Sequence, residues 1–131
     1  MNKARADSAL PRERRTGADP AAAVLVCLDL GEAGYEEGIE EMLRLAQSAG
    51  ARRYRLVLGR RDHPNPKFYA GAGKVAEIGR AAADLNAAFV IFNHALTPAQ
   101  QRNLEQALGC RVLERTELIL EIFARRAQTN E

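Results

Sequence analysis

The stretch AAAVLVCLDL, residues 21–30, decides the fold of this 131-residue chain. It is a short, nearly unbroken apolar run that is followed by Gly31, and such runs are typical of β-strands buried on both faces. Parallel strands need long crossover connections, which are usually helices lying on the faces of the sheet. The run therefore predicts a parallel sheet between two layers of helices.

The rest of the chain alternates between helical and extended patterns. Apolar residues recur at three- and four-residue steps in four segments and form short runs in four others. The predicted helices are 35–50, 74–86, 97–109 and 117–131, and the predicted strands are 21–30, 51–61, 87–93 and 110–114. This alternation predicts an α/β domain with a mainly parallel four-stranded sheet and helices on both faces.

The chain has room for one domain and not for two. Residues 1–20 mix charges with Pro, Gly and Ala without a sustained period, so we expect a disordered N-terminal tail there. The α/β domain then covers residues 21–131. Two helix starts carry capping signals, Thr97 with Gln100 in one case and Thr116 in the other.

Charge and composition exclude several classes of protein. Lys and Arg number 19 against 17 Asp and Glu, so the net charge of +2 does not by itself indicate nucleic acid. Cys27 and Cys110 lie in separate apolar runs and are expected to be reduced core thiols, and no metal-ligand spacing occurs. No apolar run is long enough to cross a membrane and no signal peptide opens the chain, so we expect a cytoplasmic protein.

The connection after the second predicted strand is the unusual one. In parallel sheets ligands usually bind beyond the carboxyl ends of the strands. The connection GRRDHPNPKFYAGAG, residues 59–73, is longer than most links of this kind, and long irregular links on a rigid scaffold often bind something. The candidates for contacts to a nucleotide phosphate or an RNA phosphate are Arg60, Arg61, His63, Lys67, Gly71, Gly73 and Lys74.

The Gly71-x-Gly73-Lys74 stretch is not a phosphate-binding loop of the Gly-x4-Gly-Lys-Ser/Thr type. Phe68 stands where the first glycine should be, and Val75 stands where a hydroxyl should bind magnesium. Hydrolysis of a nucleoside triphosphate is therefore not expected here. The glycines either let the chain turn into the following helix, or they expose amides that hold a phosphate together with Lys74.

Other polar residues have a structural and a functional interpretation. His94 follows the third strand, and packing against the next helix is favoured over acid–base chemistry because no partner stands at a catalytic spacing. Arg102 either pairs with Glu105 or contacts a partner domain. Three arginines of the second strand are expected to face the Glu-rich first helix or solvent, namely Arg52, Arg53 and Arg55.

Two stretches carry a resemblance to a known family. HPNPKFYAGAGKVAEI (63–78) and FNHALTPAQQRNLEQALGCRVLERTELILEIFARRAQTNE (92–131), with the spacing between them, resemble the N-terminal domain of the HflX-type, ribosome-associated GTPases. The likeness covers roughly residues 22–131. It rests on the combination of the Gly71 turn, the helix start at Thr97 and the apolar pattern of the last helix.

The resemblance implies a domain order and a set of partners. In that family this domain comes first, a helical linker follows, and a GTPase domain then holds GTP and Mg²⁺; the whole protein binds the large ribosomal subunit. The 131 residues contain no phosphate loop and no guanine-recognition motif, so we expect neither GTP hydrolysis nor a cofactor in this chain. The chain is expected to be a truncated gene product or an excised domain. The candidates for contacts with the other domains are Arg102, Asn103 and Arg115.

Two functions follow from this sequence. The first is a noncatalytic module that binds the large ribosomal subunit through rRNA and modulates the GTPase domain. The alternative is a small ATP-binding enzyme that uses the turn from Gly71 to Lys74. Apolar residues of the last helix, which the family's linker would cover, also predict self-association or moderate stability of the isolated chain.

Overall fold

The computed structural model describes residues 17–129, with the backbone alone from residue 125 onward. Strands and helices alternate along the whole described chain, as the sequence predicts. The strands are β1 (Asp19–Asp29), β2 (Arg53–Arg60), β3 (Ala87–Phe92) and β4 (Arg111–Leu113). The helices are α1 (Tyr35–Ala49), α2 (Ala72–Leu85), α3 (Pro98–Leu108) and α4 (Arg115–Thr129). No helix within residues 17–129 is long and apolar enough to span a membrane.

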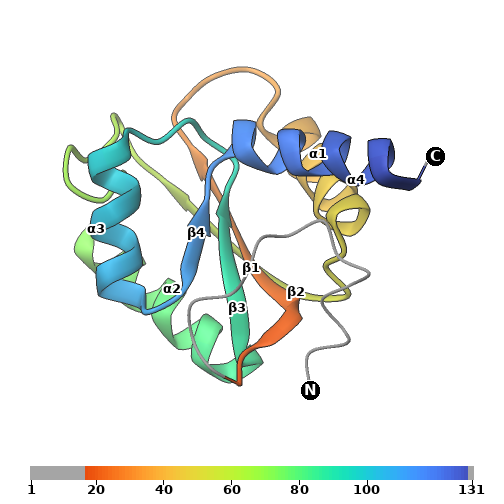
Figure 1. The fold of residues 1–131 in the computed structure, drawn as a ribbon. Helices are drawn as coiled ribbons and strands as arrows, with labels where there is room; N and C mark the ends of the chain where they lie inside the picture. Colours follow the sequence, from red (N-terminus) through yellow and green to blue (C-terminus); the bar gives the residue numbers. More distant parts are fainter. Residues whose placement is uncertain (1–16, 130–131) are drawn as a thin grey trace.

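The four strands form one parallel sheet in the order β2-β1-β3-β4. In Figure 1, α1 and α4 lie together on one side of the sheet and α2 and α3 lie on the other. The predicted α/β class, with a parallel four-stranded sheet and helices on both faces, is confirmed.

Strand β1 forms the centre of the sheet because every residue from 22 to 28 is buried. Side chains alternate across a strand, so Leu25 and Cys27 enter the cluster under α1 and α4. Val24 and Val26 enter the cluster under α2 and α3, which also contains Cys110. Both cysteines are reduced thiols buried in the core, as expected, and they lie on opposite faces of the sheet. Burial raises the pKa of Cys27 to about 11, so its thiol stays protonated.

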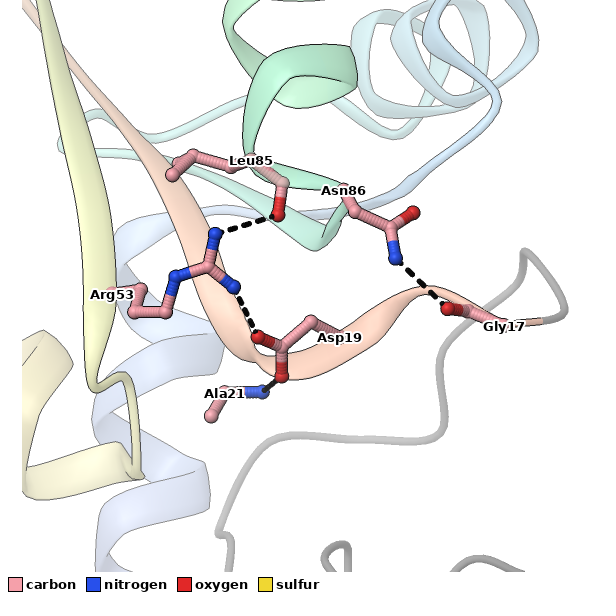
Figure 2. A network of polar contacts seen from close by, with 6 residues as sticks. All are labelled: Gly17, Asp19, Ala21, Arg53, Leu85 and Asn86. Carbon is pink, nitrogen blue, oxygen red and sulfur yellow. Dashed lines mark hydrogen bonds and ion pairs between the residues drawn. The ribbon is translucent and has the colours of Figure 1, made fainter.

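Polar contacts tie the amino-terminal edge of the sheet together (Figure 2). The Asp19 carboxylate accepts a hydrogen bond from Ala21 N and forms an ion pair with Arg53 at 2.6 Å. Arg53 also donates to Leu85 O, and the Asn86 side chain donates to Gly17 O. These contacts join the start of β1 to β2 and to the end of α2.

This network explains two differences from the sequence prediction. Strand β1 begins at Asp19, so residues 19 and 20 belong to the sheet rather than to the tail, and residues 1–16 lie outside the described part of the chain. Arg53 and Arg55 are exposed to solvent, which was one of the two expected alternatives. Their acidic partners are Asp19 of β1 and Asp84 of α2 rather than the glutamates of α1.

The helix caps show one correct prediction and one wrong one. The Thr97 hydroxyl accepts from Gln100 N at 3.0 Å and the Gln100 side chain accepts from Thr97 N, which is the expected capping box. Helix α4, however, begins at Arg115 rather than after Thr116. Glu114 caps it, because its carboxylate accepts from Glu117 N while its own N–H donates to the Glu117 carboxylate.

Replacing Leu25 tests the central position of β1. Leu25→Ala removes a fully buried side chain from a tightly packed cluster, so we expect the free energy of unfolding to fall by roughly 2–5 kcal/mol. Leu120→Ala makes the same chemical change at a residue that is 60% exposed. It should change the free energy of unfolding by less than about 0.5 kcal/mol. Urea unfolding of both variants measures the difference. Equal effects would show that β1 is not the centre of the core.

Candidate functional site at the carboxyl edge of the sheet

The strand order creates a crevice at the carboxyl ends of β1 and β3. The chain leaves β1 toward β2 on one side, and β3 lies on the other side, so the two connections diverge. A cavity of about 140 Å³ lies at this point. It is lined by residues that follow β1, including Asp29 and Glu32, and by Asn93 and His94 after β3. This cavity therefore lies at the carboxyl edge of the sheet, the edge at which the sequence predicts binding residues.

His94 joins the two strands at this crevice. Its Nε2 accepts a hydrogen bond from Leu28 N at 2.9 Å, and its ring lies 4.8 Å from the ring of Tyr69. Burial, and secondarily the positive charge of Arg115, lower its pKa to about 4. Nε2 accepts, so the neutral ring carries its proton on Nδ1. His94 thus has a structural role, but the partners of its side chain are Leu28 of β1 and Tyr69, where the sequence prediction named the next helix.

Arg115 is also engaged within the domain. Its guanidinium donates to the Asn93 side chain and to Glu41 at 2.7 Å, so it links α4 to the end of β3 and to α1. The hydrogen bond and the charge of Arg115 lower the pKa of Glu41. Asn93 in turn donates to Gly38 O. The described contacts of Arg115, a candidate for contacts with other domains, hold α1 and α4 in place.

The connection between β2 and α2 is irregular but firmly held. Asn65 and Tyr69 exchange two backbone hydrogen bonds, and the Asn65 side chain accepts from Lys67 N and Phe68 N. Two side chains of α3 hold the loop from outside. Gln100 donates to Asn65 O at 2.8 Å and Asn103 donates to Lys67 O at 3.1 Å. Asn103, expected as a domain contact, therefore positions the loop.

Tyr69 was not recognised from the sequence. Its φ is +66°, in the left-handed region that residues other than glycine seldom occupy. The ring is 7% exposed and lies against Phe92 and His94. This burial places the aromatic side chain beside the crevice and stabilises the unfavourable backbone angle. The only sequence signal was the two prolines shortly before it, at 64 and 66, and they do not specify such an angle.

Four basic candidates of the sequence lie at the end of β2 and in this loop. The Arg60 side chain is 82% exposed and lies 3.7 Å from Asp29. Arg60 and Arg61 line a hollow of about 280 Å³ together with Gly31 and the acidic Asp62. Arg61 Nε donates to His63 O at 3.0 Å, and the Lys67 ammonium lies 5.2 Å from the centre of the Phe68 ring. The structure thus brings Arg60 and Arg61 together and leaves His63 and Lys67 exposed further along the loop.

The turn from Gly71 to Lys74 is built for packing. Helix α2 begins at Ala72, and a Cβ on Gly71 would lie 2.7 Å from Arg61 Nη1, so Gly71 makes room for that guanidinium. The Lys74 ammonium donates to Leu58 O at 2.6 Å and to Glu77 at 2.7 Å. Gly73 has no atom near its missing Cβ, and nothing in the structure explains it.

Arg102 and Glu105 line the same shallow hollow on the outer face of α3. The Glu105 carboxylate also accepts from Val112 N at 3.0 Å and lies 3.8 Å from Arg111, so it joins α3 to β4. The two interpretations of Arg102, a pair with Glu105 and a contact with a partner domain, stay predictions. Within residues 17–129, no group of three His, Cys, Asp or Glu side chains could hold a metal ion.

The low pKa of His94 predicts acid sensitivity. The unfolded ring binds a proton near pH 6.5 and the folded ring only near pH 4, so stability is fully present above pH 6.5 and falls as the pH decreases toward 4. The loss should be on the order of 2–3 kcal/mol. Unfolding of the wild type and of His94→Gln across this range measures it. The variant should lose most of this pH dependence, whereas His63→Gln, at the exposed histidine, should keep it. A His94→Gln variant with the unchanged slope would contradict this assignment.

Comparison with known proteins places this domain. A family model described as GTP-binding GTPase N-terminal matches residues 36–124. GTPase HflX of Escherichia coli (strain K12) is 45% identical over 109 residues, which are 83% of this chain and 26% of that protein. GTPase HflX of Flavobacterium psychrophilum is 34% identical over 106 residues, which are 81% of this chain and 26% of that protein. The chain thus spans about a quarter of the length of these relatives.

Solved structures give the same result. The crystal structure of SsGBP in complex with GDP has a TM-score of 0.58 and 27% identity, over 79% of this chain and 28% of that one. A GTP-binding protein from the archaeon Sulfolobus solfataricus in complex with GDP has a TM-score of 0.57 and 25% identity, over 79% of this chain and 30% of that one. The predicted resemblance is confirmed: the chain belongs to the GTP-binding GTPase N-terminal family and corresponds to the N-terminal domain of HflX-type GTPases.

Proposed function

We propose that this domain is a noncatalytic module that helps an HflX-type GTPase bind the large ribosomal subunit through rRNA, and that it modulates the GTPase domain. The observation that carries the proposal is the loop between β2 and α2. Arg60 and Arg61 line one hollow together with Asp62, and His63 and Lys67 are exposed in the same loop. Cations that contact backbone phosphates supply most of the affinity of nonspecific RNA and DNA binding.

The way in which the loop is held supports a binding role. Gln100 and Asn103 fix the carbonyl groups of Asn65 and Lys67, so the backbone is already ordered before a partner arrives. A preorganised surface loses less conformational entropy on binding than a mobile one. The Arg60 side chain is 82% exposed and its ion pair with Asp29 is long, at 3.7 Å, so it can exchange this weak contact for a phosphate.

A catalytic role fits the geometry less well. The Lys74 ammonium is held by Leu58 O and Glu77, so a phosphate would have to displace both contacts. The sequence of residues 1–131 contains no hydroxyl after this lysine to bind magnesium. The alternative function, an ATP-binding enzyme built on this turn, is therefore not favoured. GTP and Mg²⁺ would be bound by the GTPase domain of the family, and the setting of this function would be the cytoplasm.

Contacts with the helical linker and the GTPase domain would use other surfaces. Leu120 and Phe123 of α4 are 60% and 58% exposed, and Arg102 is exposed on α3. Exposed apolar side chains on one helix are suited to packing against a neighbouring helix. We infer that these residues receive the linker, and that α4 transmits its position to the crevice through Arg115.

Ribosome binding tests the proposal. The double variant Arg60→Ala/Lys67→Ala should bind purified large ribosomal subunits about tenfold more weakly than the wild type at low salt, because it loses two phosphate contacts. The slope of log affinity against log salt concentration should fall in magnitude by roughly 1.5–2. Sedimentation of a labelled chain with the subunits measures both quantities.

The matched control is Arg52→Ala/Arg80→Ala, which removes two exposed charges outside this loop. Its affinity should stay within about twofold of the wild type. Equal losses in both double variants would mean that general charge, not this loop, attracts the subunit. Metal-dependent ATP turnover that disappears in Lys74→Ala would instead support the enzyme.

A further inference from the structure

Two adjacent glutamines of α3 contact different parts of the domain. Gln100 is 6% exposed and donates to Asn65 O at 2.8 Å, in the loop after β2. Gln101 donates to Val112 O of β4 at 2.7 Å and to the Glu117 carboxylate of α4 at 2.6 Å. Helix α3 therefore lies between the loop and β4 and contacts both, as Figure 1 shows.

The contact of Gln100 lies at the base of the loop. Asn65 O also accepts from Tyr69 N at 2.8 Å, so the carbonyl that Gln100 holds is one that closes the turn 65–69. The Asn65 side chain accepts from the next amides of this turn, Lys67 N and Phe68 N. A shift of Gln100 therefore reaches residues 67–69 through the single residue Asn65.

The contact of Gln101 lies at the cap of α4. Glu114 and Glu117 each accept at 3.2 Å from the backbone amide of the other, and this reciprocal pair begins the helix. Gln101 donates to Glu117 Oε1, the same oxygen that accepts from Glu114 N. A movement of α4 that displaces Glu117 must therefore displace or break the contact with Gln101 as well.

The edge of β4 makes this connection stiff. Strand β4 lies at the end of the sheet, and Val112 N donates to Glu105 at 3.0 Å while Val112 O accepts from Gln101. Gln101 and Glu105 are four residues apart and so lie on one side of α3. Together they satisfy both backbone groups of Val112, as a neighbouring strand would. Helix α3 is thus fixed to β4 at two points and follows the start of α4.

We propose that Gln101 is a positioning residue for the loop after β2: it fixes α3 to the start of α4, so that the position of α4 sets the order of this loop. The inference rests on the proposed RNA-binding role of the loop and names its regulation. It is separate from the contacts of Arg115, which lead to Asn93 and Glu41. A loop that loses this support loses more conformational entropy when it binds.

Gln101→Glu breaks the connection. The new carboxylate cannot donate a hydrogen bond, and it repels the carboxylate of Glu117. Amide hydrogen exchange at residues 67–69 should become about fivefold faster or more, relative to exchange at Leu25. The Leu25 amide lies in the buried centre of the sheet and reports global opening, so the ratio removes any general loss of stability.

The matched control is Gln106→Glu, which adds the same charge at an exposed position of α3. Exchange at residues 67–69 should stay at the wild-type rate in this variant. The double variant Gln101→Glu/Glu117→Gln exchanges donor and acceptor, because the new amide at position 117 can donate to the new carboxylate at position 101. It should return loop exchange at least halfway to the wild-type rate, which a purely destructive substitution would not do.

A second variant keeps the proposal open to contradiction if Gln101→Glu does not fold. Gln101→Met removes the donor without adding charge, and circular dichroism checks the fold of both variants. Faster exchange at residues 117 and 118 with unchanged exchange at residues 67–69 would overturn the proposal, because α4 would then be released without effect on the loop. Unchanged exchange at both places would overturn it as well.

Binding to large ribosomal subunits separates this inference from the proposed function. The affinity of Gln101→Glu should be about threefold below that of Gln106→Glu, which carries the same charge. Faster loop exchange without this loss would support the coupling and contradict the RNA-binding role of the loop. Unchanged loop exchange, with weaker binding of Arg60→Ala/Lys67→Ala, would support the RNA-binding role and overturn the coupling.

Discussion

The burial of β1 on both faces is the constraint on which the rest of the structure depends. Seven consecutive residues of this strand are enclosed, and helices must cover both sides of it to remove them from water. Helices α1 and α4 pack on one face, and α2 and α3 pack on the other. Strand β1 lies between β2 and β3, so the connections that follow β1 and β3 run in different directions. The crevice therefore lies beside the carboxyl end of β1.

From that point, a small number of polar contacts organises the carboxyl edge. His94 accepts from Leu28 N and so fixes the connection after β3 to the end of β1. Gln100 and Asn103 of α3 fix the loop after β2, and Arg115 connects α4 to Asn93. These contacts place the basic loop on a rigid support. His94, Gln100, Asn103 and Arg115 each join two parts of the chain at this edge.

The periodic features of the sequence predicted the fold, because strands and helices here are specified locally. The capping box at Thr97 is one such signal, and the long run at 21–30 is another. Features that depend on distant residues could not be predicted. Glu114 replaced Thr116 as a cap through its partner Glu117, and the partner of Arg53 proved to be Asp19, a residue assigned to the tail.

The candidate site shows the same limit. The carboxyl edge follows from topology, so residues 59–73 could be selected from the sequence alone. The engagement of Lys74 with Leu58 and Glu77, and the space that Gly71 leaves for Arg61, depend on how α2 docks on β2. The sequence motif Gly-x-Gly-Lys does not by itself distinguish a turn that binds a phosphate from a turn that packs against a strand. The left-handed backbone of Tyr69 likewise has no local signature.

The central claim is that the carboxyl edge, through the loop between β2 and α2, is the surface that meets RNA. Amide hydrogen exchange of the chain in complex with the large ribosomal subunit tests this claim most directly. The account predicts slower exchange in residues 60–69, with no change at the amino-terminal edge around Asp19 and Arg53. Protection confined to that opposite edge, or exchange unchanged throughout residues 60–69 in a saturated complex, would contradict it.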